Sequence, residues 1–418
     1  MPGTLVSAIR AHYLGHSPRR WAALAGLGAL ALAAALLSPQ NAAPHRVAIE
    51  VDCTAAGACE LAESLALDVW SEQRGARLPL DVVVSSDSLA KLDAAHVRWQ
   101  VIEADIDAAA RAESARLHAA AARQPADWFA DYRDYRAITE RMIELATLAP
   151  DRVTMHGIGS TLDGRTIWAL RIGPRNGKPM LINGTQHARE WIATMVTTCV
   201  ADRLVREYDS NPNIRAFVDS TALWVVPVVN PDGYQYSWSS DRYWRKNRRG
   251  GFGVDLNRNF SVGWGGRGSS NNRRAQDYRG EGAFSEPETV ALRDLAMREH
   301  IALHVDFHSY SQLVLYPWNY AAQAAKDRDL FRAVGDRMAS AMFAEHDKRY
   351  ALMQGVELYP AAGTMSDWAY GEAGALSFTI ELRPKMGRGG FVLPPEEIRP
   401  TCDEGLAAVL ALRTAPSP

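Results

Sequence analysis

Three side chains that could share one metal ion stand at the ends of two apolar stretches. His187 and Glu190 follow the apolar run of residues 179–182, and His308 closes the run that begins at Leu303. Two imidazoles and one carboxylate, with a fourth position left for water, are typical of a catalytic zinc site, whereas structural zinc sites are closed by four protein ligands. The spacing therefore predicts one Zn²⁺ ion held by His187, Glu190 and His308.

His304 is an alternative third ligand. It lies four residues before His308, so in a strand the two side chains face the same side. His308 is preferred because it stands where the apolar strand ends and Ser309 and Tyr310 begin.

A further carboxylate, Glu381, follows the apolar run of residues 376–380. A carboxylate at the end of a buried strand needs a partner, because desolvation penalises its charge. It could form a buried ion pair with Arg383 or another arginine. It could also be the general base that takes a proton from the attacking water. The residues alone leave both interpretations open.

The elements that must position these residues alternate between strand and helix. An α/β fold with a mixed, mostly parallel sheet sandwiched by helices is the architecture that this alternation favours. Ligands of such sheets collect at strand ends, where His187, His308 and Glu381 are expected. Strands are predicted at residues 165–172, 178–182, 222–229, 303–307 and 376–382, and helices at 132–148, 191–208, 286–300, 326–346 and 395–412.

A smaller α+β domain is expected before this sheet. Alternating patterns predict strands at residues 47–51, 80–84 and 97–101, with helices at 61–70, 88–95 and 106–123. The last helix carries Arg111, Arg116 and Arg123 and is broken by Gln124 and Pro125, which is typical of a connector that a protease cuts. The predicted boundaries are 1–44 for a leader, 45–124 for this domain and its connector, and 125–418 for the catalytic domain.

The N-terminus indicates export. Arg10, Arg19 and Arg20 precede an uncharged, Ala- and Leu-rich run of about 17 residues at 21–37. That length fits either a signal peptide or an uncleaved membrane anchor. The expected location is secreted or periplasmic, or alternatively membrane-anchored with the catalytic domain outside the cytoplasm.

Composition excludes some classes of partner. A formal net charge of -2 gives no reason to expect nucleic acid, which requires a clustered basic face. Four cysteines are too few for a disulfide scaffold. Cys53 and Cys59 could bridge a small loop, and Cys199 and Cys402 could pair if the fold brings them together; four free thiols are the alternative.

Several ordered motifs then resemble the zinc metallocarboxypeptidases of the carboxypeptidase A/B type, over most of the chain from about Trp128 onward. The first 120 residues or so look like that family's export signal and pro-segment. The motifs are residues 187–191 (HAREW), 230–234 (NPDGY), 242–246 (RYWRK), 255–260 (DLNRNF), 308–312 (HSYSQ), Tyr359 ahead of 366–368 (SDW), and 378–383 (FTIELR).

The resemblance implies a role for each matched residue. Glu381 activates water, and Arg245 stabilises the oxyanion of the tetrahedral intermediate. Asp255 holds one ligand histidine by a hydrogen bond. The remaining matches bind substrate: Asn257 and Arg258 grip the free α-carboxylate, Arg189 contacts a carboxylate further out, Ser309 and Tyr310 line neighbouring subsites, and Tyr359 closes over the bound residue.

The implied reaction is removal of the C-terminal residue from peptides or proteins. Ser366, Asn319 and Gln354 fall near the side-chain pocket and are polar and uncharged, which favours a broad preference for neutral C-terminal residues, apolar or aromatic. The chain would be made as a zymogen and activated by a protease. Two other interpretations remain: a peptidase acting on cell-wall or modified peptides, and a carboxypeptidase-like binding domain without catalysis.

Overall fold

The computed structural model describes residues 44–71, 79–123 and 127–415. The predicted leader run at residues 21–37 lies outside this part of the chain. Among the described residues, none of the helices combines the length and the apolar character that a membrane span requires.

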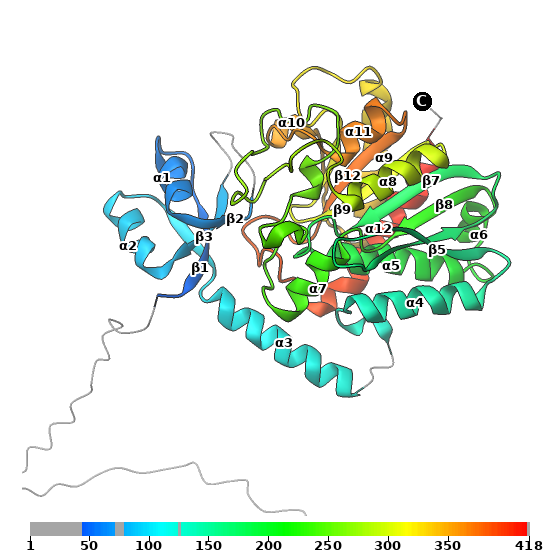
Figure 1. Cartoon of the computed structure of the whole chain (residues 1–418), viewed down its shortest axis with the longest axis horizontal. Coiled ribbons are helices and arrows are strands. Elements are labelled where there is room, and N and C mark those ends of the chain that lie inside the picture. Colours follow the sequence, from blue (N-terminus) through cyan, green and yellow to red (C-terminus); the bar gives the residue numbers. More distant parts are fainter. Residues whose placement is uncertain (1–43, 72–78, 124–126, 416–418) are drawn as a thin grey trace, which may run out of the picture. The chain divides into compact units, whose positions relative to one another are not determined.

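The N-terminal part is a four-stranded antiparallel sheet with strand order β2-β3-β1-β4. Val47, Ile49 and Val51 of β1 alternate inward and pack with Val82 and Val84 of β3. A long helix, α3, follows the sheet and spans the residues predicted for it. The elements are β1 Arg46–Val51, α1 Ala58–Leu65, β2 Ala66–Val69, β3 Leu80–Ser85, α2 Ser86–Ala94, β4 Trp99–Glu103 and α3 Ile106–Arg123 (Figure 1).

One helix predicted in the N-terminal part is wrong in its second half. The helix expected at residues 61–70 ends at Leu65, and the next four residues form β2 on the sheet edge. Ala66 lies opposite Val84 and Val69 lies opposite Val82. Pairing with β3 therefore overrides a helical pattern that is short enough to be ambiguous.

An eight-stranded sheet forms the larger part, with strand order β11-β10-β12-β9-β7-β8-β6-β5. The central strands β12, β9, β7 and β8 are parallel, and antiparallel pairs flank them on both sides. Its strands are β5 Val153–Ser160, β6 Thr166–Ile172, β7 Lys178–Gly184, β8 Thr221–Val226, β9 Leu303–Ser309, β10 Leu313–Tyr316, β11 Ala351–Gln354 and β12 Leu376–Leu382.

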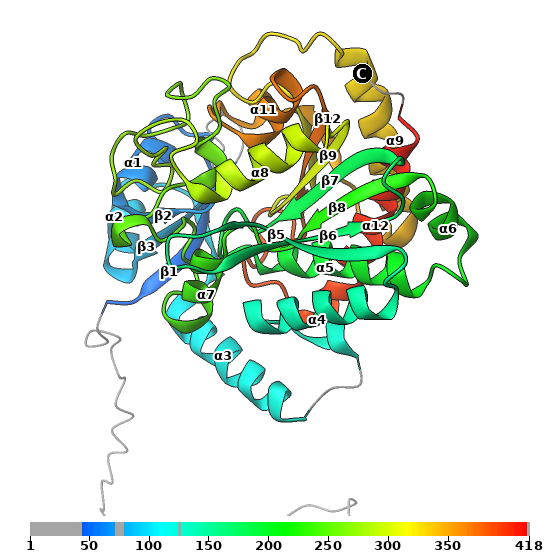
Figure 2. The same cartoon turned by 45° about the vertical axis from the view of Figure 1, so that its right-hand side comes forward.

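Helices cover both faces of this sheet (Figures 1 and 2). On one face α4, α5, α9 and α12 share one hydrophobic core with Met180 and Ile182 of β7. On the other face α8 and α11 share a second hydrophobic core with Leu181, which lies between Met180 and Ile182 in β7. The helices are α4 Tyr135–Leu148, α5 Trp191–Arg206, α6 Pro212–Val218, α7 Pro231–Ser239, α8 Pro287–Arg298, α9 Arg328–His346, α10 Gly355–Leu358, α11 Met365–Gly371 and α12 Ile398–Arg413.

The predicted fold class is confirmed, and three strands were missed. β5, β10 and β11 lie at or next to the edges of the sheet. β10 and β11 are four residues each, and β5 contains Gly157 and Gly159. Such strands carry too little alternation to be recognised before the sheet that pairs them is known.

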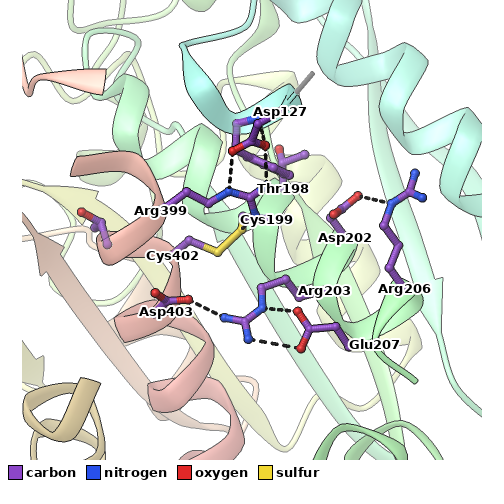
Figure 3. The surroundings of a disulfide bond; sticks show 12 residues. Asp127, Thr198, Cys199, Asp202, Arg203, Arg206, Glu207, Arg399, Cys402 and Asp403 are labelled. Atoms are coloured by element: carbon purple, nitrogen blue, oxygen red, sulfur yellow. Dashed lines mark hydrogen bonds and ion pairs between the residues drawn. A yellow bond between two sulfur atoms is a disulfide. The ribbon is translucent and has the colours of Figure 1, made fainter. Parts of the chain in front are cut away.

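Two disulfides join the four cysteines in the pairs considered from the sequence. Cys53 pairs with Cys59 across 6 residues, and Cys199 pairs with Cys402 across 203 residues. Figure 3 shows the second bond between α5 and α12, where Arg203 Nη1 also donates to Asp403 Oδ1 at 2.6 Å. The covalent bond and the ion pair together join α5 and α12, two of the helices that cover one face of the sheet.

We predict that replacing Cys199 and Cys402 together by alanine lowers the stability of the larger part by roughly 4–5 kcal/mol, because closing so long a loop removes much entropy from the unfolded chain. The midpoint of thermal unfolding should fall by about 10 °C. Differential scanning calorimetry of the oxidised chain measures the change.

The matched control is Cys53→Ala with Cys59→Ala, which opens only a small loop in the separate N-terminal sheet. This control should leave the midpoint of thermal unfolding of the larger part unchanged. An equal effect of the two double variants would contradict the loop-length argument.

Candidate functional site

The carboxyl ends of three parallel strands bring the predicted site together. His308 is the sixth residue of β9 and lies opposite Glu381 of β12 in the parallel pairing. On the other side of β9, Asn183 of β7 lies opposite Asp306. Because the strands run in the same direction, residues that follow β7 and those that end β9 and β12 meet at one edge of the sheet.

The loop between β7 and α5 carries His187 and Glu190. Gly184 ends β7 where an added Cβ would lie 2.6 Å from Thr197 Oγ1 of α5, so only glycine lets strand and helix approach this closely. Thr185 follows with φ at 62°, and its hydroxyl is held by Thr194 and by the carbonyl of Pro227. The backbone strain at Thr185 is thus fixed by its surroundings, which is common at functional sites.

His187, Glu190 and His308 converge on one point. Each offers a donor atom within 4.8 Å of the other two, and all three side chains are buried. His308 Nδ1 lies 3.1 Å from His187 Nδ1 and 2.9 Å from Glu190 Oε2, and His187 Nδ1 lies 2.8 Å from Glu190 Oε1. Glu190 occupies the N-cap position of α5 without capping it, because its carboxylate faces the imidazoles instead.

Aspartates back both imidazoles. His187 Nε2 lies 3.0 Å from Asp255 Oδ1, and His308 Nε2 lies 2.9 Å from Asp306 Oδ2. When the two imidazoles are neutral, these contacts place their ring protons on the Nε2 atoms, and both Nδ1 atoms then present lone pairs toward the carboxylate of Glu190. Three lone-pair donors that face one another repel unless a cation lies between them, and the donor set therefore fits a divalent metal.

The charges around Glu190 favour its anionic form. Burial by itself would raise the pKa of Glu190, but the positive charges of protonated His187 and His308 lower it by more, so that pKa lies below its usual value. Asp255 is likewise wholly buried. Burial opposes its charge, yet Arg245, Arg258 and His187 hold the pKa of Asp255 well below its ordinary range.

Asp255 connects the metal-ligand group to two arginines. Its side chain accepts from the backbone N–H of Asn257 at 2.9 Å, which starts the short helix Leu256–Arg258. Arg245 Nη2 donates to Asp255 Oδ2 at 2.9 Å, and the carbonyl of Arg245 accepts from Ala188 N beside His187. One carboxylate thus orients His187, Arg245 and the segment that carries Asn257 and Arg258.

A small cavity of about 50 Å³ collects most of the predicted residues. Its lining includes the three metal-ligand side chains together with Glu381, Arg245, Asn257, Ser309, Tyr310 and Tyr359. Arg258 lies beside it and donates from Nη2 to Tyr359 Oη at 3.3 Å. Asp255 does not line the cavity, but it contacts His187 and Arg245, which do.

Besides Arg258, two predicted substrate-binding residues, Ser366 and Arg189, do not line this cavity. Ser366 is buried in α11, where its hydroxyl accepts from Asn319 Nδ2 at 3.0 Å. Arg189 is fully buried and donates from Nη1 to Asp68 Oδ2 of the N-terminal sheet at 2.5 Å, with its guanidinium over the ring of Phe391. Phe391 itself lines the cavity.

The structure gives the surroundings of His304 and Arg383, the alternative ligand and ion-pair partner considered from the sequence. His304 is buried in β9 and lies 2.7 Å from Ser377 Oγ and 2.8 Å from Asn183 Oδ1, away from the metal-ligand group. Arg383 directs its guanidinium to Glu404 and Glu397.

Sequence reasoning missed two residues that position the site. Asp306 holds His308, and it also accepts from Asn183 and Gln186. Its place two residues before His308 in the same strand was the available signal. Asn230 donates to the carbonyls of Gln186 and Lys246, clamping the loops that carry His187 and Arg245. Its position before Pro231 suggested a turn only.

Comparisons with known proteins agree with this geometry. The model of the zinc carboxypeptidase family matches residues 138–408. Carboxypeptidase B of Bos taurus is 37% identical over 289 residues, covering 66% of this chain and 69% of that protein. Metallocarboxypeptidase A of Trichophyton rubrum is 32% identical over 414 residues, covering 94% of this chain and 98% of that protein.

Solved structures show the same arrangement over most of the chain. Thrombin activatable fibrinolysis inhibitor superposes with a TM-score of 0.80 at 27% identity, covering 88% of this chain and 98% of that one. Carboxypeptidase A of Helicoverpa armigera superposes with a TM-score of 0.78 at 28% identity, covering 89% and 98%. With its buried His-Glu-His group at the strand ends, this chain belongs to the zinc carboxypeptidase family, a family of peptide hydrolases whose cofactor is Zn²⁺.

Proposed function

We propose that the chain removes single residues from the C-terminus of peptides by hydrolysis, with Glu381 as the general base. The observation that carries this proposal is that Glu381 and Arg245 line one cavity with the His187, Glu190 and His308 side chains. A base, a cation and a metal-ligand group around one small space are what hydrolysis of an amide requires.

His187, Glu190 and His308 would hold the zinc ion. Bound there, the ion supplies Lewis acidity, which polarises a carbonyl oxygen and makes a water molecule acidic enough to lose a proton near neutral pH. The aspartates keep both imidazoles in the tautomer that presents Nδ1.

Glu381 would take that proton and later give it to the leaving amine. Its position opposite His308 in the sheet puts the carboxylate beside the ligand group. Arg245 would stabilise the negative charge that develops on the carbonyl oxygen, since its guanidinium is already oriented by Asp255 and needs little reorganisation.

The free α-carboxylate of the substrate would bind to Asn257 and Arg258. Asn257 Oδ1 accepts from Met365 N at 2.8 Å, which fixes the amide and leaves its NH₂ group toward the site. Arg258 is 1% exposed and adjoins Tyr359, which would close over the bound residue. Arg189, Ser309 and Tyr310 would contact the substrate further from its C-terminus.

A neutral side-chain pocket is supported by the hydrogen bonds around Ser366. Asn319 and Thr379 contact the Ser366 hydroxyl. The adjacent Asp367 carboxylate already accepts from the backbone N–H groups of Asn319 and Tyr320, and burial raises the pKa of Asp367 to about 7. A carboxyl group so engaged gives little attraction to a cationic substrate side chain.

The N-terminal sheet would act as an inhibitory pro-segment. Trp70 and Ser71 line the site cavity themselves. Asp68 is ion-paired with Arg189, and Asp81 Oδ2 accepts from the Tyr310 hydroxyl at 2.6 Å. Two residues proposed to bind substrate are thus bound by acidic residues of the same chain, so activity would require cutting of the connector by a protease.

Export is supported by the two disulfides, since such bonds persist in oxidising compartments. Secretion, periplasmic release and tethering by the N-terminal segment all satisfy this condition.

The two alternative functions considered from the sequence make different demands on this site. A peptidase for cell-wall or modified peptides would use the same machinery on unusual C-terminal residues. A binding domain without catalysis usually lacks a ligand or the base, and here all of them meet at one site.

We predict that the purified chain binds one zinc ion and that His308→Ala lowers this to well below one, because a single imidazole and carboxylate remain. Inductively coupled plasma mass spectrometry after gel filtration gives the ratio. His118→Ala, on the exposed face of α3, is the matched control and should retain the metal. Full zinc content in the His308→Ala chain would contradict the ligand assignment.

We predict that the processed enzyme releases Phe and Leu from blocked dipeptides faster than Lys and Arg, with kcat/KM at least severalfold higher. The measurement is released amino acid against time for four peptides that differ only in the last residue. A tenfold preference for Lys or Arg would overturn the neutral pocket.

Glu381→Gln is the control for catalysis in the same assay. It keeps the shape of the side chain but removes the base, so kcat should fall by about 10²-fold or more while zinc stays bound. Unchanged kcat, or activity that survives a zinc chelator, would contradict the mechanism and favour another assignment of the base.

We predict that limited trypsin cleavage of the connector near Arg111, Arg116 or Arg123 raises activity on a blocked dipeptide by about tenfold or more. The N-terminal contacts with Arg189 and Tyr310 become intermolecular after the cut and can dissociate. Activity is followed alongside the appearance of the cleaved chain on a gel. An uncut chain as active as the cut one would remove the inhibitory role.

The inhibitory contact should also depend on pH. Burial raises the pKa of Asp81 from 3.8 to about 6 and outweighs the hydrogen bonds from Tyr310 and Gly387, which lower it, so the docked state favours the neutral form of Asp81. This contribution is fully present below pH 3.8 and is lost as pH rises through 6. Release of the cut N-terminal fragment in gel filtration should therefore be easier at pH 7.5 than at pH 5, and Asp81→Asn should reduce the difference.

A further inference from the structure

A large groove adjoins the candidate site without belonging to it. It encloses about 1210 Å³ and lies between α9, the segment that leads into β11 and the segment that follows β12. The site cavity measures about 50 Å³ and the groove is many times larger. None of the residues assigned to metal binding, catalysis or substrate binding lines it.

The groove is continuous with the site. Ser311 lines both spaces, directly after Tyr310 in the chain. On the opposite wall Val392 lines the groove, while its neighbour Phe391 lines the site. A polypeptide whose C-terminus occupies the site can therefore leave it past Ser311 and enter the groove.

Four exposed cations line this groove, namely Lys348, Arg349, Lys385 and Arg388. Arg383 is a fifth, but it is buried and engaged by Glu404 and Glu397. The exposed acidic residues of the lining are Asp336 and Asp347.

The four exposed cations differ from many other surface arginines of the protein. Arg136 pairs with Glu140, and Arg298 pairs with Glu299. Within the described ranges, no ion pair of the four groove cations is seen, and Arg349 instead stacks over the ring of Phe343. Cations gathered in a concave surface with few local counter-charges focus a positive field into it.

We propose that this groove is an exosite for the substrate itself: it binds carboxylate side chains that lie several residues upstream of the C-terminal residue. The proposal rests on the proposed carboxypeptidase function and adds the class of polypeptide that the enzyme favours, namely chains with an acidic segment before a neutral C-terminal residue. Attraction between this segment and the four cations lowers KM and leaves kcat unchanged, because the reacting atoms are elsewhere.

Binding is tested first, on the uncut chain, because all residues that line the groove lie after position 310 and the groove is open with the N-terminal sheet in place. The probes are two fluorescent peptides, one with four Glu residues upstream of a C-terminal Phe and one with Gln at those positions. Fluorescence anisotropy should give a Kd about tenfold lower for the Glu peptide at low salt. Raising the salt to about 0.5 M should remove most of the difference.

The variant is Lys385→Glu with Arg388→Glu, which should abolish the preference for the Glu peptide. Its matched control, Arg136→Glu with Arg298→Glu, makes the same change of charge outside the groove and should keep the preference. Lys348→Gln with Arg349→Gln is a milder second variant and should reduce the preference about threefold.

Kinetics on the trypsin-processed enzyme separate this inference from the proposed function. The Lys385→Glu, Arg388→Glu variant should raise KM for the Glu peptide while its rate on a blocked dipeptide stays normal. Normal dipeptide hydrolysis with equal KM values for both long peptides overturns the exosite alone. If the processed enzyme without substitutions does not hydrolyse the dipeptide, the proposed function is overturned. In that case, a Kd for the Glu peptide that rises in the Lys385→Glu, Arg388→Glu variant would still show that the groove binds acidic chains.

Discussion

The site depends on one buried carboxylate. Asp255 is inaccessible to solvent and accepts hydrogen bonds from His187, from Arg245 and from the backbone of Asn257. The groups that Asp255 orients offset its negative charge. In this buried site, away from water, neutral hydrogen-bond partners would hold those groups less strongly than the carboxylate does. An amide at this position would have to accept from three donors with a single oxygen. His187, Arg245 and the segment that begins at Asn257 would then all be held less firmly.

Parallel strand ends supply the rest of the geometry. Sequence reasoning could find His187, Glu190, His308 and Glu381 because each follows an apolar stretch, and a run that is apolar throughout indicates a strand buried on both faces. The ordered motifs added Asp255 and Arg245, which lie in loops with no periodicity of their own.

What the sequence did not reveal depends on contacts between distant segments. Asp306 gains its importance only when His308 turns Nε2 toward it. Asn230 is recognisable as a clamp only once the loops at Gln186 and Lys246 are adjacent. The strand at residues 66–69 forms because β3 offers it a free edge, and local spacing had indicated a helix there.

The bond between Cys199 and Cys402 has a consequence for biosynthesis. The ribosome must make 203 further residues after Cys199 before its partner exists. During that interval α5 carries an unpaired thiol, and α12 is still missing from the face of the sheet that it will cover. The covalent closure of this face therefore comes late, after the last helix has been made. Until then, newly made chains depend on whatever shields the exposed apolar surface.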